Sequence, residues 1–200
     1  MDAKTQKSEL TRTAIVGAAV DLALADGLEA ITLQAVASRL GLSKSGVFSR
    51  VGSREALQKA VIEEYGRRFL ADVFVPAMQK PKGLARLSDI MERWIARTRD
   101  VEVETGCIYI AGAFELDDRE GQLRNVLFDE ITRWRAALRR TVLQAMESGE
   151  LKPDTDPAQM VSEINGLVMT LLHDARFLRD PHAADRAMKT WQRILSTTRA

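Results

Sequence analysis

TLQAVASRLGLSKSGVFSRVGSREAL, residues 32–57, is the stretch that decides the fold. Thr32 is a good N-cap, and the apolar spacing that follows it predicts a helix over residues 33–40. Gly41 tolerates the positive φ that the end of that helix requires, and Ser43 caps the next helix after a short turn. The order of these residues predicts a helix-turn-helix, followed by the start of another helix.

The second helix of this motif has a small, polar and basic outer face. Val47 points inward, which leaves on the outer side Lys44, Ser45, Gly46, Ser49 and Arg50. The major groove of DNA admits one α-helix, and Lys, Arg and Ser side chains read its base edges or hold its phosphates. Residues 39–59 also carry five basic side chains against one acid, Glu55, which is the charge sign that DNA requires. The alternative is an ordinary helical hairpin with a solvated basic face.

The segment resembles the DNA-binding domain of TetR-family transcriptional repressors. In that family a capped helix is followed by a Gly-hydrophobic-Ser turn, a recognition helix that ends in an aromatic residue, and a Ser-Lys/Arg-Glu-x-Leu motif. The corresponding residues here are Thr32 and the segments 40–43, 47–48 and 52–57. The resemblance extends back through TAIVGAAVDLALADGLEAIT, which begins at Thr13.

The outer face and the resemblance together mark a set of candidate DNA-binding residues. They are Thr32, Ser43, Lys44, Ser45, Gly46, Phe48, Ser49, Arg50 and Arg54. Three positions depart from the usual family pattern, because Phe48 replaces Tyr, Arg50 replaces His and Val51 replaces Phe. The family Tyr is expected to reach a phosphate, so we expect Phe48 to lack one hydrogen bond and the charge of Arg50 to compensate.

The composition is that of an ordinary soluble globular protein, with 200 residues, 46% hydrophobic, 28% charged and a net charge of +1. The single cysteine, Cys107, leaves no intramolecular disulfide and no multi-cysteine zinc site, as is usual in a reducing cytoplasm. The sequence contains neither a signal peptide nor an apolar run of membrane-spanning length. We therefore expect a cytoplasmic protein that is neither exported nor inserted in a membrane.

Helical periodicity continues on both sides of the motif. A first helix is predicted over residues 8–26. Residues 1–7 before it are expected to form a flexible arm whose Lys4 and Lys7 can meet a phosphate backbone, and solvated disorder without such a role is the alternative. Further helices are predicted over residues 53–75, 84–98, 105–116, 120–148 and 157–179, and after Asp180 and Pro181.

No alternating β pattern intervenes, so the predicted fold is all-α. Residues 1–60 are expected to form a three-helix helix-turn-helix DNA-binding domain, with the motif at about 32–50. By the resemblance, residues 61–200 are expected to form a helical ligand-binding and dimerisation domain.

The last two predicted helices carry apolar residues on more than one face. These residues are Ile164, Leu167, Val168, Leu171, Leu172, Ala175, Leu178, Met188, Trp191 and Leu195. One interpretation is a deep core within a single chain. The other, which the family resemblance favours, is a homodimer in which both chains contribute these helices to a four-helix bundle. A twofold dimer would bring two recognition helices to the half-sites of a palindromic operator.

The resemblance also implies that residues 84–179 enclose an effector whose binding releases the DNA. Each candidate lining residue is predicted to lie on an inner face and is aromatic, sulfur-bearing, small or polar. The candidates are Trp94, Cys107, Ala111, Phe114, Trp134, Met169, His173 and Phe177. Their chemistry indicates an apolar or aromatic ligand with one or two polar handles, and His173 is the best handle among them. Plain core packing is the alternative for each residue.

The sequence gives little support to an enzyme or to a bound cofactor. Its only histidines are His173 and His182, and it contains no metal-spaced cluster, no GxSxG and no glycine-rich phosphate loop. The leading hypothesis is a ligand-responsive homodimeric DNA-binding regulator, which we expect to be a repressor. The alternative is an all-helical small-molecule-binding or protein-interaction module with little specific DNA binding.

Overall fold

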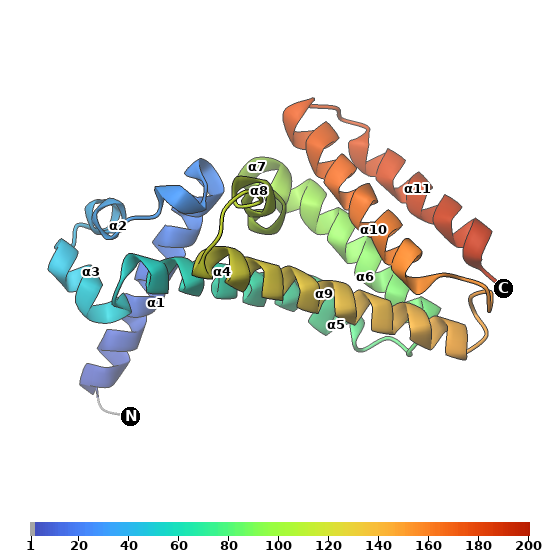
Figure 1. Cartoon of the computed structure of the whole chain (residues 1–200), viewed down its shortest axis with the longest axis horizontal. Helices are drawn as coiled ribbons and strands as arrows, with labels where there is room; N and C mark the ends of the chain where they lie inside the picture. The colour runs from blue at the N-terminus through green and yellow to red at the C-terminus, as the bar shows by residue number, and fades with distance from the viewer. Residues whose placement is uncertain (1–2) are drawn as a thin grey trace. The chain divides into compact units, whose positions relative to one another are not determined.

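The computed structural model describes the chain from Ala3 to Ala200, with side chains from Thr5 onward. The chain forms two compact units: unit 1 consists of Met1–Arg68 and Cys107–Glu130, and unit 2 of Phe69–Gly106 and Ile131–Ala200. The ribbon in Figure 1 is helical in both units. The only β pairing among the described residues is an isolated antiparallel bridge between Leu151 and Arg199. The expected all-α fold is confirmed.

Unit 1 holds the N-terminal helices and one later hairpin of helices. Its elements are α1 (Ala3–Asp26), the 3-10 turn η1 (Leu28–Ala30), α2 (Leu33–Leu40), α3 (Lys44–Val51), α4 (Arg54–Phe69) up to Arg68, α8 (Ile108–Glu115) and the start of α9 (Gln122–Glu147).

Unit 2 holds the remaining helices and three π-helical turns. Its elements are η2 (Leu70–Phe74), α5 (Val75–Ala77), α6 (Leu84–Arg97), η3 (Thr98–Glu102), α7 (Val103–Thr105), the rest of α9, α10 (Pro157–Leu172), η4 (His173–Phe177) and α11 (Ala183–Thr198). Along the described part of the chain, no helix combines the length and the apolar content that crossing a membrane would require.

The helix-turn-helix forms as the sequence predicts. Gly41 ends α2 with a φ of 64°, in the left-handed region that its missing side chain permits. Ile15 from α1, Val36 from α2 and Val47 from α3 are fully buried, so the three helices share one apolar core. Leu57 of α4 is also fully buried in unit 1.

The first helix begins earlier than predicted. α1 starts at Ala3, so residues 3–7 are helical and the prediction of a flexible arm is wrong for them. Lys7 is exposed on this helix, whereas the side chain of Lys4 and residues 1–2 lie outside the described part. The error arose because a helix with a polar first turn shows no apolar periodicity there.

Proline 76 shapes the end of the long fourth helix. In a regular α-helix its ring would clash with the carbonyl of Asp72, and it has no N–H to donate. The backbone avoids this clash by forming the π-helical turn η2, in which the N–H of Val75 donates a hydrogen bond to the carbonyl of Leu70. The predicted helix over 53–75 is therefore α4, η2 and the short α5 in succession.

Two other predicted helix starts are wrong. Gly106 has a φ of 86°, so the helix expected from residue 105 begins only at Ile108. Asp180 does not cap the last helix as an N-cap, because α11 begins at Ala183 and the carboxylate of Asp180 instead accepts the backbone N–H of His182 at 2.9 Å. The cap of α10 is confirmed, since the Asp156 carboxylate accepts an amide of the first turn.

Candidate nucleic-acid interface and ligand site

The outer side of α3 presents the residue types that the sequence led us to expect. Lys44, Ser45, Ser49 and Arg50 are exposed, while Val47 is fully buried. Among the described residues, no acidic side chain forms an ion pair with Lys44 or Arg50. Both charges therefore remain available to phosphates.

The hydroxyls of Thr32 and Ser43 cap the N-termini of α2 and α3, respectively. Thr32 Oγ1 accepts the N–H of Ala35 at 3.0 Å, and Ser43 Oγ accepts the N–H of Gly46 at 3.0 Å. A Cβ on Gly46 would lie 3.1 Å from Ser43 Oγ, so a larger residue there would press on this cap. The small residue at this position keeps the N-terminus of α3 open to close approach, where helix amides suit a phosphate.

Phe48 is the one large apolar residue on the outer side of α3. Its side chain is 58% exposed, and it lacks the hydroxyl with which a tyrosine could donate a hydrogen bond.

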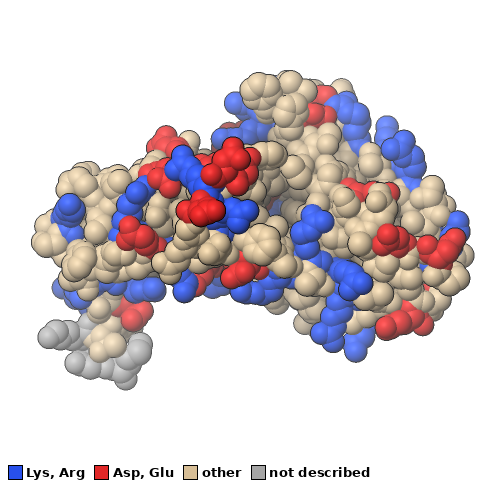
Figure 2. Space-filling model, in the orientation of Figure 1, with Lys and Arg blue, Asp and Glu red and all other residues tan. Residues whose placement is uncertain are grey.

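Over the face drawn in Figure 2, Lys and Arg are interspersed with Asp and Glu, so net charge does not mark a DNA-binding surface there. The case for DNA binding rests on individual exposed residues of α3 instead.

Arg54 is engaged inside unit 1. Its Nε donates to the carbonyl of Ile31 at 2.8 Å, and its Nη2 donates to the carbonyl of Glu29 at 2.6 Å and to the Glu29 carboxylate at 3.0 Å. The guanidinium thus ties the start of α4 to the connection between α1 and α2. We do not include it among the proposed DNA contacts, although its charge and position suggested that role in the sequence.

A second polar contact on the same connection involves α8. The carboxylate of Glu115, the last residue of α8, accepts the backbone N–H groups of Leu28 and Glu29. The amide of Gln58, which is buried, donates to the carbonyl of Leu28 at 2.9 Å. In the sequence, Glu115 belongs to an acidic break that is typical of a surface loop, and nothing in the local spacing indicates so distant a partner.

Four aromatic rings form a cluster in unit 2, which we call the aromatic cluster: Phe69, Phe74, Trp94 and Trp134. Trp94 and Trp134 meet edge to face with ring centroids 5.2 Å apart, and Phe69 lies 5.5 and 4.9 Å from the two tryptophans. Phe74 packs on Trp134 at 5.9 Å. The sequence predicted Trp94 and Trp134 as lining residues; Phe69 and Phe74 were not predicted.

The tryptophans of the cluster each bury a polar atom. Trp94 and Trp134 are 6% and 5% exposed, and the Nε1 atom of each is buried without a hydrogen-bond partner. An unsatisfied buried donor costs about 1–3 kcal/mol, so most proteins avoid one. Two adjacent rings of the cluster therefore each hold an unsatisfied hydrogen-bond donor.

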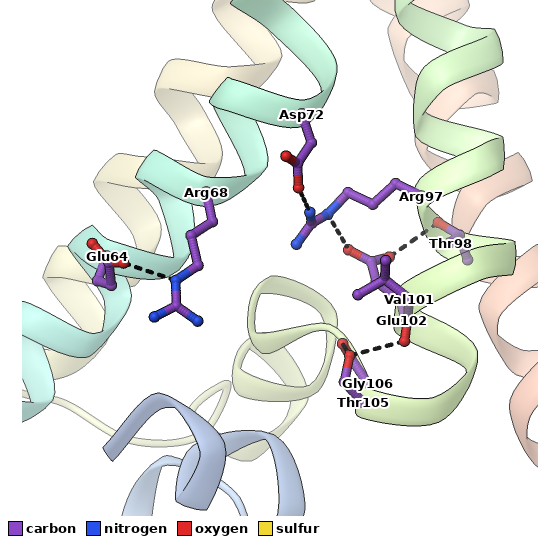
Figure 3. Close-up of polar contacts among 9 residues, drawn as sticks. All are labelled: Glu64, Arg68, Asp72, Arg97, Thr98, Val101, Glu102, Thr105 and Gly106. Atoms are coloured by element: carbon purple, nitrogen blue, oxygen red, sulfur yellow. Dashed lines mark hydrogen bonds and ion pairs between the residues drawn. The ribbon is translucent and has the colours of Figure 1, made fainter. Parts of the chain in front are cut away.

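A charged residue borders this cluster. The guanidinium of Arg97 lies over the ring of Phe69, 5.7 Å from its centroid. As Figure 3 shows, Arg97 reaches between Asp72 of η2 and Glu102 of η3, and it hydrogen-bonds to both carboxylates. Glu102 is fully buried and also accepts the hydroxyl of Thr98 at 3.0 Å. Arg97 therefore joins two π-helical turns to the aromatic cluster.

Several predicted lining residues do not lie on an inner face. Cys107 is buried in unit 1, at the N-cap of α8. Five other predicted lining residues are exposed: Ala111, Phe114, Met169, His173 and Phe177. The expectation for α8 is wrong because the helix starts later and buries Ile108 and Gly112.

His173 and Phe177 lie in η4, where the widened turn changes the face that each residue occupies. The His173 ring packs against Phe177, with centroids 5.4 Å apart, and its Nδ1 lies 3.0 Å from the carboxylate of Asp174. These contacts are on the surface, with 58% of the His173 side chain exposed. The prediction that His173 points into a pocket as a polar handle is therefore wrong.

A capped helix-turn-helix in an all-helical chain, with a buried aromatic cluster in a second unit, is the organisation of a ligand-responsive DNA-binding regulator. The family model for the tetracyclin repressor-like C-terminal domain matches residues 83–191, more than half of the chain. The chain therefore belongs to the TetR family of transcriptional regulators, which are DNA-binding proteins and not enzymes.

Solved structures with the same fold cover most of the chain. A TetR regulator from Chloroflexus aurantiacus is 20% identical over 97% of this chain and 98% of its own, with a TM-score of 0.83. One from Cytophaga hutchinsonii is 18% identical over 97% of both chains, with a TM-score of 0.81. AibR, solved in complex with isovaleryl coenzyme A and operator DNA, is 20% identical over 80% of this chain and 85% of its own, with a TM-score of 0.67. No curated protein sequence matches this one.

Proposed function

We propose that the protein is a homodimeric repressor that binds a palindromic operator through α3 and releases it when an effector reaches the aromatic cluster. The DNA contacts are assigned to exposed residues around α3 and to the two helix caps. They are Thr32, Ser43, Lys44, Ser45, Gly46, Phe48, Ser49 and Arg50. The observation that carries the proposal is the exposed pair Lys44 and Arg50, which have no acidic partner in the described part of the chain.

The effector site is assigned to Trp94 and Trp134. Their two buried indole N–H groups lack partners, so a ligand that supplies a carbonyl, carboxylate or ether oxygen would satisfy groups that packing leaves unsatisfied. The surrounding rings offer an apolar environment, which supports the expectation of an apolar or aromatic ligand with a polar handle. AibR, which has the same fold, was solved with both a small molecule and operator DNA.

α4 supports a link between the two activities. One end of this helix carries Arg54, which holds the carbonyls of Glu29 and Ile31, and the other end carries Phe69 of the aromatic cluster. A ligand that moves Phe69 therefore acts on the helix that braces the helix-turn-helix. By thermodynamic linkage, an effector that weakens DNA binding is itself bound more weakly by the DNA complex.

The homodimer is assigned to α10 and α11. Most of the apolar residues that suggested it, including Ile164, Val168 and Trp191, are buried within the single chain, so they do not require a partner. The support is a groove of about 610 Å³ between α10 and α11, whose lining combines the small residues Gly166 and Ala187 with charged ones such as Glu163 and Arg186. Small residues let two helices of a partner approach closely, and a twofold pair provides the two α3 helices that a palindrome needs.

The experiment that tests this function is the selection of bound sequences from a random duplex pool, with complex mass measured by light scattering at low and high salt. We expect a palindromic motif bound by an even number of chains. Recovery of no motif, with weak binding that salt abolishes, would contradict the proposal and favour a small-molecule-binding or protein-interaction module.

A further inference from the structure

A groove in unit 2 has a strongly one-sided charge. It lies between the segment from η2 to the start of α6 and the second half of α9, and its volume is about 420 Å³. Lys82, Arg86 and Arg140 line it together with Phe74 and Met78. The described residues that line this groove include no acid, and no described acidic side chain forms an ion pair with its three cations.

Arg86 is held in place within this groove. Its Nη2 donates to the carbonyl of Lys80 at 2.9 Å and lies 3.4 Å from that of Met78, at the turn that follows α5. Its Nε is buried and has no hydrogen-bond partner. A guanidinium that is already fixed loses little freedom when it binds an anion, and its planar donors match a carboxylate or a phosphate.

Arg140 supplies a second charge from the opposite side of the groove. It projects from α9 into the lining and is exposed, as is Lys82. Like charges that converge without a counterion repel each other, and a bound anion removes that repulsion. The groove therefore favours an anionic ligand over a neutral or cationic one.

The apolar side of the groove continues into the aromatic cluster. Phe74 lines the groove and also packs edge to face on Trp134, with ring centroids 5.9 Å apart. One ligand can therefore place an anionic group between Arg86 and Arg140 and an apolar body against Phe74 and Met78. Through Phe74, a ligand in the groove would contact the side chain that packs on Trp134, whose indole N–H lacks a partner.

We propose that the effector is an amphipathic anion, a carboxylate or phosphate on an apolar chain or ring, whose charged group binds Arg86 and Arg140. This inference rests on the proposed function, because it assigns a ligand class to the effector response of unit 2. Lys82, which also lines the groove, adds to the same positive field.

Calorimetric titration of the full chain without DNA tests the ligand class. The probes are decanoate, decyl phosphate, decanol and inorganic phosphate. We expect both amphipathic anions to bind at least roughly tenfold more tightly than decanol, which corresponds to about 1.4 kcal/mol, and more tightly than inorganic phosphate. The stronger of the two anions identifies the head group as carboxylate or phosphate. Equal binding of decanol and decanoate, or binding of inorganic phosphate alone, would overturn the inference.

Matched variants locate the site. Arg140→Gln removes a charge that makes no described contact within the protein, and we expect it to weaken decanoate binding roughly tenfold while the melting temperature stays unchanged. Arg86→Gln should weaken it further. Arg135→Gln, on an exposed position of α9 outside the groove, is the control and should leave binding unchanged. Equal affinities of wild type and Arg140→Gln would overturn the assignment.

A failure of this inference can be separated from a failure of the proposed function. If the duplex selection recovers a palindrome but no amphipathic anion binds, the regulator assignment stands and the ligand class is wrong. If decanoate binds at Arg140 but no DNA motif is recovered, the ligand class stands and the operator assignment is wrong.

Discussion

The carboxylate of Glu115 accepts the backbone N–H of Leu28 at 2.9 Å, although the two residues are 87 positions apart in the chain. The same carboxylate accepts the neighbouring N–H of Glu29 at 2.8 Å. Through these two bonds, the C-terminus of α8 holds the 3-10 turn η1 between α1 and α2, within unit 1. Gly27 has a φ of 89°, and a Cβ there would lie 3.0 Å from Glu115 Oε2, so this close approach needs glycine.

Replacing Glu115 should therefore loosen unit 1. Glu115→Gln keeps the shape but has only one acceptor oxygen, and a lost charge-assisted bond costs about 1.5–3 kcal/mol. We expect the free energy of unfolding in urea to fall by about 1–2 kcal/mol, discounted for partial exposure. Glu120→Gln, at an exposed position without a described long-range contact, is the control. An unchanged urea midpoint for Glu115→Gln would show that the contact does not stabilise unit 1.

Arg50 and Arg54 should respond differently to truncation. Arg50→Ala removes an exposed charge from α3, so operator affinity should fall by about 1–3 kcal/mol with no change in melting temperature. Arg54→Ala leaves the carbonyls of Glu29 and Ile31 without their donor, so its main effect should be a lower melting temperature. The measurement is a salt-dependent DNA titration beside a thermal melt. A stable Arg54→Ala protein with a reduced salt slope would return Arg54 to the DNA contacts.

Trp134→Phe should cost little stability for so large a buried ring. The change leaves a cavity, but it also removes a buried N–H that has no partner, and such a donor costs about 1–3 kcal/mol. We expect the free energy of unfolding to change by less than about 1 kcal/mol. Trp191→Phe, at a fully buried side chain of α11, is the comparison and should cost more. A loss above about 2 kcal/mol for Trp134→Phe would mean that its indole N–H is satisfied in solution.

Gly166→Arg should separate the protomers without unfolding them. A Cβ at Gly166 meets no atom within 4 Å, so the single chain can accommodate a side chain there. The arginine would lie in the groove between α10 and α11 and block a close partner. Light scattering should report a monomer for this variant and a dimer for the wild type. Ser162→Arg, exposed on α10 but not part of the groove lining, should remain dimeric. A dimeric Gly166→Arg would place the interface elsewhere.

Acid should remove the contribution that the Glu64 carboxylate makes to the free energy of unfolding. Hydrogen bonds from Arg67, and then from Arg68, lower the pKa of Glu64 from 4.5 to about 2, and Figure 3 includes the Arg68 contact. Because the pKa is lowered in the folded state, the carboxylate stabilises the fold above pH 4.5, and this stabilisation is lost as the pH falls toward 2. The arginines are largely exposed, so the contribution is only about 0.5–1 kcal/mol.

Urea unfolding of Glu64→Gln and wild type at pH 7 and pH 3 measures this contribution. The variant should be less stable by that small amount at pH 7, and the difference should shrink at pH 3. A difference that stays constant between the two pH values would show that Glu64 stabilises the fold through packing and not through its charge.

Short-range signals account for the part of the fold that was predictable. Thr32, Gly41, Ser43 and Asp156 act within one helical turn of their own positions, so their roles can be read from the local order of residues. The capping of helices and the burial of Val47 followed directly.

Contacts between distant segments were not predictable in the same way. The partners of Glu115 and Arg54 depend on which loops the fold brings together. Trp94 and Trp134 were predicted individually, but the edge-to-face contact and the unpaired indole donors follow from the relative rotation of α6 and α9. The exposure of His173 depends on the π-helical turn η4, for which the residue pattern gives no signal.

The π-helical turn η2 has a consequence for comparing this chain with its relatives. A helix advances about 100° with each residue, so the extra residue that η2 accommodates sets the rotation of the helix beyond it. In that rotation, Phe74 meets Trp134. A relative that lacks the proline at position 76 and continues as a regular α-helix would align correctly only with a one-residue gap inside Leu70–Phe74. Ungapped alignments would equate ring positions that lie on different faces, and they would misidentify the counterparts of the aromatic cluster.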